Sequence, residues 1–454
     1  MVHTYSLNEY NIAIDGNSGA VHLLDELTYQ ILQDEKYLPS IKKAVYKLKS
    51  KYKLEEIKEA YKEIKLLEEQ GTLFSSIENI ERAAVSKKVI TTLKALCLHV
   101  SHDCNLRCEY CFASEGDYNS GRKLMEKEVA IKAVDYLVAN SQGRHKIEID
   151  FFGGEPLMNF DVVEAVVKYG RKIEKEINKR FYFTITTNGT LLNKQRIEFI
   201  NEYMDNVVIS IDGRKEVHDE TRHDCNGKGS YEKIVPLAKE LVAGRNGKSY
   251  FVRGTFTAKN KDFSNDVMHL AELGFKEISV EPVVGSGNDL YFKDADTHDI
   301  LKEYENLALK YIDRLKSDNK FRFYHFNINL EDGPCLLKRI TACGAGYEYL
   351  AVSPEGKLYP CHQFVGQDEF MVGDIYSGIS NNELCKEFQV NTVFEKEKCR
   401  ECWAKLFCSG GCHASAFFTN GNIKEPNETS CILQKKRIEC AIMIKAWQLQ
   451  QSTK

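Results

Sequence analysis

The sequence predicts an α/β protein: a central region of parallel β/α units, with a small winged-helix-like module before it and a cysteine-rich region after it. Strand and helix patterns alternate from Thr92 to about Lys320, and polar motifs follow the strands. This alternation is typical of parallel β/α units, whose ligand sites lie at the carboxyl ends of the strands. Ten of the 15 cysteines lie after residue 334. The length of 454 residues suits about three domains.

The first expected domain, residues 1–85, combines short strands with a helical pattern. The strands are 2–7, 10–15 and 20–25, separated by turn signals at Asn8 and at Asp15-Gly16-Asn17. Apolar residues then recur at helical spacing from Pro39 to Gln70. We expect a three-stranded module of the winged-helix kind. DNA binding is one use of such a module, but the net charge of -4 gives no electrostatic footprint for nucleic acid.

The second expected domain, residues 92–325, contains six strands that alternate with helices. The strands are 93–100, 146–152, 181–187, 206–211, 250–257 and 277–283. Helix-like segments such as 126–140, 161–178 and 230–243 lie between them. This order predicts a partial (β/α)6, TIM-like barrel. The third expected domain, 334–454, has few long periodic segments, so bound metal would supply much of its folding free energy.

The composition bears on where the protein works. The N-terminus has no basic region followed by an apolar run, so no secretory signal is expected. No stretch approaches the roughly 20 apolar residues that span a bilayer, so no membrane partner is expected. We therefore expect a cytoplasmic protein. In a reducing cytosol, clustered cysteines indicate metal ligation or redox chemistry rather than disulfides.

The loop after the first central strand reads HDCNLRCEYC and holds Cys104, Cys108 and Cys111. Three thiols are one short of the four that close a structural zinc or iron-sulfur site. His102 is a candidate fourth ligand, although its place directly before the loop makes the geometry awkward. The spacing favours an open iron-sulfur site, and closed zinc remains the alternative.

This CxxxCxxC motif, with Tyr110 before its last cysteine, resembles the radical S-adenosylmethionine (radical SAM) superfamily. The resemblance covers residues 92–435. It implies that the three cysteines hold a 4Fe-4S cluster whose fourth iron binds the amino and carboxylate groups of S-adenosylmethionine. Reductive cleavage of the cosubstrate would then yield a 5'-deoxyadenosyl radical, and the cofactor would supply the hard chemistry.

The motifs after the next strands match the same family. Gly153, Gly154 and Glu155 in FGGEP resemble its second element, in which the glutamate accepts from the methionyl ammonium. The remaining residues expected at the cofactor are Tyr110, Thr187, Asn188, Ser210, Asp212 and Arg222. The resemblance places Arg222 facing the cofactor carboxylate. Taken singly, these motifs are ordinary turns and, for Arg222, a surface ion pair.

The C-terminal cysteines form a second pattern, Cx12Gx4C from Cys343 through Gly356 to Cys361 and then Cx2Cx5Cx3C from Cys399. It resembles the seven-cysteine SPASM extension of radical enzymes that modify peptides and proteins, with a zinc ribbon as the alternative. The resemblance assigns two auxiliary 4Fe-4S clusters, making three in total. The ligands of one are Cys399, Cys402, Cys408 and Cys431, and those of the other are Cys343, Cys361 and Cys412.

The second auxiliary set again counts three cysteines. Relatives with a closed cluster carry a further cysteine where this chain has GAGYEYL, so one iron would be open to a substrate thiolate. Cys335 lies eight residues before Cys343 and is an alternative fourth ligand. The other cysteines are expected to be unligated: Cys97, Cys225, Cys385 and Cys440.

The whole layout resembles ribosomal-peptide maturases, and most closely the thioether-forming maturases of six-cysteine SCIFF peptides. By that resemblance the precursor leader adds as a strand to an exposed edge at 20–25. The adenosyl radical takes a hydrogen from a residue such as Thr, and a Cys thiolate on the open auxiliary iron captures the carbon radical. A ferredoxin or flavodoxin would supply electrons. The sequence assigns no catalytic base.

Three alternatives stay open. A sulfatase-maturase-like enzyme would oxidise one Cys or Ser to formylglycine. Another radical peptide maturase would form a carbon-carbon bond and leave thiols free. A non-enzymatic peptide adaptor would bind zinc and contain no acid-labile sulfide.

Overall fold

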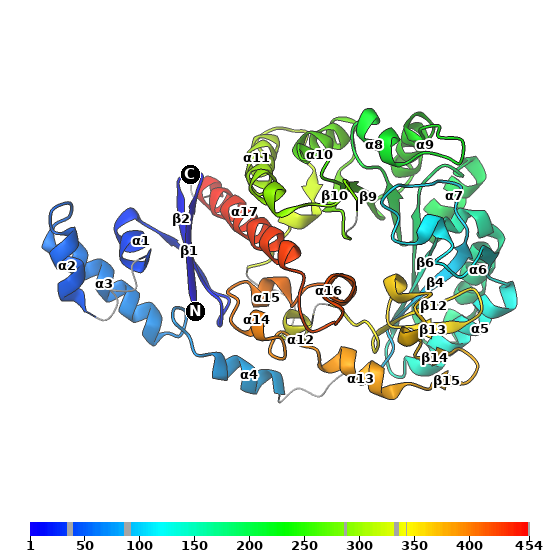
Figure 1. The fold of residues 1–454 in the computed structure, drawn as a ribbon, viewed down its shortest axis with the longest axis horizontal. Helices are drawn as coiled ribbons and strands as arrows, with labels where there is room; N and C mark the ends of the chain where they lie inside the picture. Colours follow the sequence, from blue (N-terminus) through cyan, green and yellow to red (C-terminus); the bar gives the residue numbers. More distant parts are fainter. Residues whose placement is uncertain (34–39, 86–91, 286–287, 331–335, 342, 453–454) are drawn as a thin grey trace. The chain divides into compact units, whose positions relative to one another are not determined.

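The computed structural model describes residues 1–454 except 34–39, 86–91, 286–287, 331–335, 342 and 453–454. Pro39 and Cys335, both named above, therefore lie outside the described residues. The chain forms two compact units. The barrel unit comprises Val89–Tyr324 and Cys343–Val390, and the terminal unit comprises Met1–Lys88, His325–Ala342 and Asn391–Lys454. Figure 1 shows the elements of both units.

The barrel unit is built on the six strands that the sequence predicts. They are β4 (Ala95–His102), β6 (Lys146–Gly153), β7 (Arg180–Thr187), β8 (Asn206–Ser210), β9 (Ser249–Phe256) and β10 (Glu277–Pro282). Each pairs in parallel with the next, and β11 (Arg322–Phe323) extends the sheet in parallel beyond β10. The sheet order runs open from β11 to β15. This arrangement confirms the partial parallel barrel.

The other edge of the sheet is extended by the first part of the cysteine-rich region. Strand β12 (Tyr349–Val352) pairs in parallel with β4, and β13 (Lys357–Tyr359) returns antiparallel to β12. The sheet ends in β14 (Gly373–Asp374) and β15 (Gly378–Ile379), while the short β5 (Lys123–Leu124) pairs with β4. Residues 343–390 therefore belong structurally to the barrel unit.

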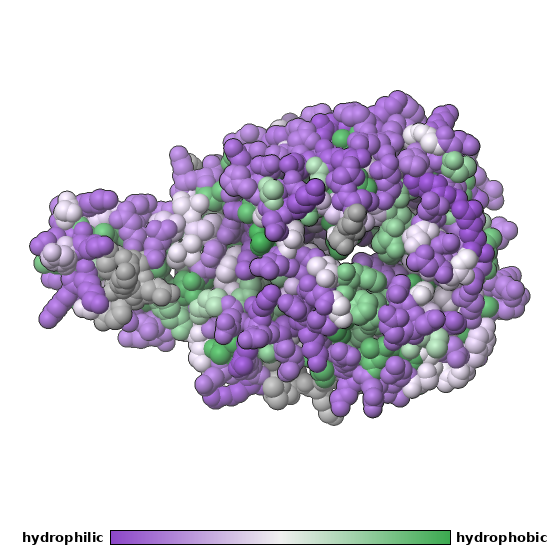
Figure 2. Space-filling view, in the orientation of Figure 1, coloured by the Kyte–Doolittle hydropathy of each residue, from purple (hydrophilic) through white to green (hydrophobic). Residues whose placement is uncertain are grey.

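Helices follow the strands and cover the outer face of the sheet (Figure 1). They are α5 (Lys127–Asn140), α6 (Phe160–Ile177), α7 (Lys194–Tyr203), α8 (Lys215–Thr221), α9 (Tyr231–Ala243), α10 (Phe263–Glu272), α11 (Thr297–Leu315) and α13 (Asn382–Val390). Alternate residues of β6 and β7 are buried, including Phe151, Phe181 and Phe183, because successive side chains of a strand point to opposite faces. In Figure 2 the visible face is mostly hydrophilic over these helices.

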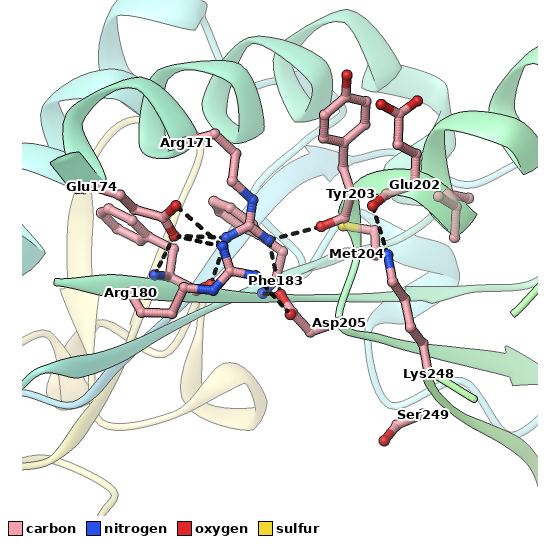
Figure 3. Close-up of polar contacts among 12 residues, drawn as sticks. Arg171, Glu174, Arg180, Phe183, Glu202, Tyr203, Met204, Asp205, Lys248 and Ser249 are labelled. Carbon is pink, nitrogen blue, oxygen red and sulfur yellow. Dashed lines mark hydrogen bonds and ion pairs between the residues drawn. The ribbon is translucent and has the colours of Figure 1, made fainter. Parts of the chain in front are cut away.

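The amino ends of β7 and β8 are held by a charged network (Figure 3). Arg171 on α6 donates to Glu174 at 2.7 Å, to the Phe181 carbonyl at 2.8 Å and to Asp205 at 3.0 Å. Asp205 also accepts from the backbone N–H of Phe183 at 2.9 Å. Because this network lies at the strand ends opposite the predicted motifs, its role is to fix the sheet rather than to contact a ligand.

The terminal unit begins with the three strands that the sequence predicts: β1 (Val2–Leu7), β2 (Tyr10–Asp15) and β3 (Val21–Leu24). They form an antiparallel sheet in the order β1-β2-β3. Helices α1 (Glu26–Gln33), α2 (Ile41–Leu48), α3 (Leu54–Glu69) and α4 (Ile77–Val85) follow. A core that includes Ala13, Ile31, Ala44 and Ile57 joins β2 to the first three helices.

The helical pattern expected up to Gln70 corresponds to two helices. Helix α2 ends at Leu48, and α3 begins at Leu54. Between them the backbone N–H of Lys51 turns back to the Leu48 carbonyl, and the Glu56 carboxylate accepts from the backbone N–H of Lys53 at 2.8 Å. This N-terminal cap starts a new helix, which the apolar spacing alone did not reveal.

The C-terminal part of the terminal unit carries short helices and one long one. They are α12 (Leu336–Ile340), α14 (Glu397–Arg400), α15 (Lys405–Cys408), α16 (His413–Asn420) and α17 (Glu428–Ser452). The 25 residues of α17 correct the expectation of few long segments here. Its consecutive residues 440–444 are all buried. Apolar residues therefore lie on every side of this part of the helix, and the sequence shows no helical period of apolar residues there. No helix in the described part of the chain is long and apolar enough to span a membrane.

Candidate iron-sulfur sites

The three thiols of the loop after β4 line one pocket with the strand-end motifs. Cys104, Cys108 and Cys111 share it with residues at the carboxyl ends of β6 to β10. Of the residues expected at the cofactor, the pocket is lined by Tyr110, Gly153, Gly154, Thr187, Asn188, Ser210 and Arg222. Side chains from six successive β/α units therefore meet at the edge of the sheet where parallel-sheet sites lie.

The loop thiols are surrounded by hydrogen-bond donors. The backbone N–H of Leu106 donates to the Cys104 sulfur at 3.4 Å, and the Asn188 amide donates to the same sulfur at 3.7 Å. The Arg222 guanidinium lies 4.0 Å from the Cys108 sulfur. Burial raises the pKa of Cys104 to about 12 and that of Cys108 to about 11. Because a metal ion stabilises the thiolates that burial disfavours, this donor set fits an iron-sulfur cluster.

The glycines of the second motif allow the Cys104 loop to approach β6. A β-carbon on Gly154 would stand 2.6 Å from the Asp103 carbonyl carbon, and Gly153 has φ of +130°. Beside Gly154 lies Gly116, which has φ of +97°, and a β-carbon on Gly116 would stand 2.7 Å from the Cys104 β-carbon and 2.9 Å from the Gly154 α-carbon. These positions accept only glycine without movement of the backbone. The three glycines thus allow the close packing around the loop that carries the first thiol.

Glu155 is fully buried and is held by protein donors. Its carboxylate accepts from the Thr187 hydroxyl at 2.7 Å and from the backbone N–H groups of Asn188 and Leu157 at 2.7 and 3.0 Å. Burial raises the pKa of Glu155 to about 6, against these hydrogen bonds. The Glu155 carboxylate thus connects the carboxyl ends of β6 and β7. Its contact with a methionyl ammonium stays a prediction.

Asp212 and Arg222 form a buried pair at the end of β8. The Arg222 Nε donates to the Asp212 carboxylate at 2.9 Å, and the Tyr110 hydroxyl donates to the same oxygen at 2.6 Å. The second carboxylate oxygen accepts from the backbone N–H of Thr255 at 2.8 Å. The fully buried Asp212 therefore orients two pocket residues, Arg222 and Tyr110, without lining the pocket itself. The surface ion pair considered for Arg222 is wrong.

His102 is not the fourth ligand that the sequence left open. It lies in β4 and is 1% exposed. Its Nδ1 lies 2.9 Å from the Ser120 hydroxyl, and its Nε2 lies 3.3 Å from Nδ1 of His99. Both ring nitrogens thus have partners within the protein, and His102 does not line the pocket that the three thiols share.

Several pocket residues were not predicted from the sequence. They are Arg253 and Thr255 on β9, Glu281 on β10, and Val283, Val284, His362 and Gln363 beyond the strands. Arg253 and Glu281 approach within 3.8 Å across the pocket. The rule that sites lie at strand ends could have found those on β9 and β10. Nothing in the sequence pattern indicated His362.

Four cysteines of the terminal unit line a second pocket: Cys399, Cys402, Cys408 and Cys431. The Cys408 sulfur accepts from the backbone N–H groups of Gly410 and Gly411, whose φ angles are +92° and +75°. Burial raises the pKa of Cys399 to about 11 and that of Cys431 to about 12. Four thiols with backbone donors are the ligand set of a closed 4Fe-4S cluster. The residues present fit the cluster predicted here.

The remaining expected set is divided between the units, since Cys343 and Cys361 belong to the barrel unit and Cys412 to the terminal unit. Its assembly stays a prediction. Of the cysteines expected to be unligated, Cys97 and Cys440 are buried, while Cys225 is exposed. Cys385 is intermediate in exposure, and none of these four lines either thiol pocket.

The thiol geometry also bears on the zinc alternative. Within the described ranges, no three His, Cys, Asp or Glu side chains are grouped as one metal ion would require. A lone zinc ion holds each sulfur at about 2.3 Å, whereas a 4Fe-4S cluster spreads its thiolates over several irons. The grouping of the thiols therefore gives no support to a single zinc ion in either pocket.

Comparison with known proteins gives the same assignment. The radical SAM superfamily matches residues 98–250, and the iron-sulfur cluster-binding SPASM domain matches residues 343–403. A cysteine-type anaerobic sulfatase-maturating enzyme of Clostridium novyi is 28% identical over 74% of this chain and 90% of its own length. The subtilosin biosynthesis protein AlbA of Bacillus subtilis is 27% identical over 71% of this chain and 67% of its own length.

Solved structures share the fold. Native anSMEcpe with bound AdoMet and Cp18Cys peptide has a TM-score of 0.64 and 23% identity, over 80% of this chain and 100% of that one. Streptococcus suis SuiB bound to precursor peptide SuiA has a TM-score of 0.54 and 17% identity, over 94% of this chain and 98% of that one. Residues 98–250 are therefore a radical SAM domain and residues 343–403 a SPASM domain, and these domains imply S-adenosylmethionine and 4Fe-4S clusters as cofactors.

Proposed function

We propose that this enzyme matures a ribosomally synthesised, cysteine-rich peptide by linking Cys sulfur to carbon. The observation that carries the proposal is that one chain contains both a radical SAM pocket and a small N-terminal sheet with an open edge. Strand β3 pairs with β2 on one side, and the described residues place no strand on its other side. An unpaired edge offers backbone donors and acceptors to an added peptide strand.

A groove beside this edge supports peptide binding. The segment after α3 contacts β3, since the His22 ring on β3 lies 2.8 Å from the Thr72 carbonyl. At the other end of β3, a groove is lined by Asp25, Glu26, Leu27, Tyr52, Glu56, Glu59, Ala60 and Glu63. Side chains of a leader strand would enter it and fix the register. The leader is thus proposed to bind at β3 and α3.

In the radical pocket, the chain's own residues bind and orient. Asp212 holds Arg222 and Tyr110 toward the pocket, while Asn188 and Leu106 hold the Cys104 sulfur by donated hydrogen bonds. When bound at Cys104, Cys108 and Cys111, the cluster and S-adenosylmethionine supply a 5'-deoxyadenosyl radical.

The auxiliary set of Cys343, Cys361 and Cys412 has three thiols, and residues 344–350 contain no cysteine. A vacant ligand position there suits a substrate thiol and favours a sulfur-based crosslink. For each crosslink the peptide would lose one hydrogen atom from carbon, one proton from sulfur and one further electron. With two auxiliary clusters, the enzyme would hold three clusters and draw electrons from a ferredoxin or flavodoxin.

A second candidate function is the oxidation of one Cys or Ser to formylglycine. The similarity to the Clostridium novyi sulfatase-maturating enzyme, which spans 90% of that protein, favours it. The missing cysteine in 344–350 and the N-terminal sheet favour the crosslinking enzyme instead.

The test uses the full-length protein, reconstituted anaerobically, with S-adenosylmethionine, dithionite and, as candidate precursors, the short cysteine-rich peptides that a search of the neighbouring genes finds. A thioether lowers the peptide mass by two hydrogens and removes one thiol from alkylation by iodoacetamide. Formylglycine from Cys also removes the sulfur and creates an aldehyde that reacts with a hydrazide. A carbon-carbon link leaves every thiol open to alkylation. An unchanged peptide mass would contradict all three.

A further inference from the structure

The turn between β2 and β3 reaches the segment that carries the cluster thiols of the terminal unit. Asp15 is fully buried, and its carboxylate accepts from the backbone N–H groups of Asn17 and Ser18 at 3.0 and 2.7 Å. It also accepts from the backbone N–H of Ser75 at 3.0 Å. These bonds fix the shape of the turn, so the residues at its tip are held in place.

The tip of the turn packs against Trp403, the residue after the ligand Cys402. A β-carbon on Gly16 would stand 2.6 Å from the Trp403 α-carbon. On β1, the ring of His3 stacks on the Trp403 ring with centroids 4.1 Å apart. Asp15-Gly16-Asn17 was predicted as a turn between strands, and the structure adds a second reason for Gly16. The sheet and the cysteine loop are one packed body.

At the centre of this contact is Lys405, which lies between the ligands Cys402 and Cys408. Its side chain is 2% exposed and lines the same pocket as the four thiols. Its ammonium donates to the Asn17 amide oxygen at 2.7 Å and lies 3.4 Å from the Cys402 carbonyl. Within the described residues no carboxylate lies within ion-pair distance of it. Its direct partners are neutral, and the carboxylates of Asp15 and Glu81 act on it only from beyond ion-pair distance, so an anion in the pocket would stabilise this buried cation further.

We propose that Lys405 is a positioning residue that raises the reduction potential of the cluster at Cys399, Cys402, Cys408 and Cys431, and that Asn17 holds it there. Reduction adds one electron to the cluster, and a fixed neighbouring cation stabilises the added negative charge. The proposal goes beyond peptide crosslinking, because it gives the N-terminal sheet a part in setting a redox potential. It requires that the cluster is present, but not that the peptide product is a thioether.

The test is an anaerobic dithionite titration of the reconstituted full-length enzyme, with each cluster followed by electron paramagnetic resonance. The affected signal is identified by its absence in Cys431→Ala. We expect Lys405→Met to lower its midpoint by at least 59 mV, which is a tenfold fall in the reduced-to-oxidised ratio for one electron. Lys405→Arg keeps the cation and should stay near the wild-type midpoint. Lys398→Met is the matched control, because Lys398 lines the same pocket but its side chain is 60% exposed.

Iron and sulfide content separates this role from a merely structural one. A structural role would lower the content and leave the midpoint of the remaining cluster unchanged. Asn17→Leu is an independent test, because it keeps the Lys405 ammonium but removes the amide oxygen that accepts from it. We expect this variant to keep its full iron content and to show a smaller fall in the midpoint potential than Lys405→Met. Wild-type midpoints in both Lys405→Met and Asn17→Leu would overturn the proposal. Loss of this cluster from both variants would also overturn it, leaving only a folding role for the contact.

Discussion

Gly154 lies against Asp103 so closely that a β-carbon on Gly154 would stand 2.6 Å from the Asp103 carbonyl carbon. The backbone N–H of the next residue, Glu155, donates to the same carbonyl at 2.9 Å. The end of β6 thus packs against the backbone of the residue directly before Cys104, the first loop thiol. The contact joins the second motif to the first without any side chain at Gly154.

We expect Gly154→Ala to displace the Cys104 loop and to lower both iron binding at the first cluster and S-adenosylmethionine affinity by at least tenfold. The added methyl group cannot be accommodated by a side-chain movement, because its neighbour is backbone. Gly143→Ala is the control, since a β-carbon at Gly143 would meet nothing within 4 Å. Iron analysis and equilibrium binding of S-adenosylmethionine measure the effect, and equal values for the two variants would contradict the expected clash.

Breaking the Asp212–Arg222 pair should destabilise the protein strongly. Asp212→Ala leaves the buried Arg222 guanidinium without its carboxylate, and such losses cost about 3 to 5 kcal/mol. Glu232→Ala, which breaks the exposed pair with Lys215, should leave the stability nearly unchanged. Urea unfolding of both variants measures the difference. Asp212→Asn should retain the fold better but lose S-adenosylmethionine affinity, because the uncharged amide no longer pairs with Arg222.

Asp150 should make stability depend on pH. Burial, with Glu148 nearby, raises the pKa of Asp150 to about 6. In the unfolded chain this carboxyl ionises near pH 4, so folding disfavours its ionised form. The free energy of unfolding therefore falls as the pH rises from about 4 to about 6. Asp150→Asn cannot ionise. We expect it to match the wild type at pH 4 and to exceed it by about 3 kcal/mol at pH 7.5. Thermal unfolding across this range measures the gap, and a constant gap would contradict the assignment.

Iron content should report two of the three cysteine sets separately. The wild type should hold about twelve irons per chain after reconstitution. Replacing Cys104, Cys108 and Cys111 with Ser should remove about four irons, and replacing Cys399 and Cys402 should remove a different four. Cys225→Ser should remove none, because Cys225 is exposed and lies outside both thiol pockets. Zinc without acid-labile sulfide in the wild type would contradict the clusters altogether.

Local patterns predicted much of the barrel unit. The strands around Ile149 and Phe183 alternate buried and exposed residues, and the helices between them have one apolar face, so both periods can be read directly. The motifs at Cys104, Gly154 and Asn188 could be placed together because parallel strands bring their carboxyl ends to one edge. The pocket then follows from the order of the elements along the chain.

What could not be predicted depends on contacts between distant segments. Asn17 and Lys405 are 388 positions apart, and each alone suggests only a turn residue and a solvated lysine. His102 could be proposed as a ligand because the sequence does not show that His99 and Ser120 occupy its ring nitrogens. Helix α17 lacked a one-sided period because its middle is buried all round. These are results of tertiary packing, which residue spacing does not encode.

The pairing of β12 with β4 also governs how this protein can be divided. All eight residues of β4 are buried, and residues 349–352 cover one of its backbone edges although they lie about 250 positions later in the chain. A fragment that stops near residue 325 would leave that edge uncovered and apolar, which invites intermolecular strand pairing. We therefore expect that residues 92–325 do not form a stable fragment alone. A chain cut between residues 325 and 349 should keep its fold only if both pieces are present, because the second piece completes the sheet.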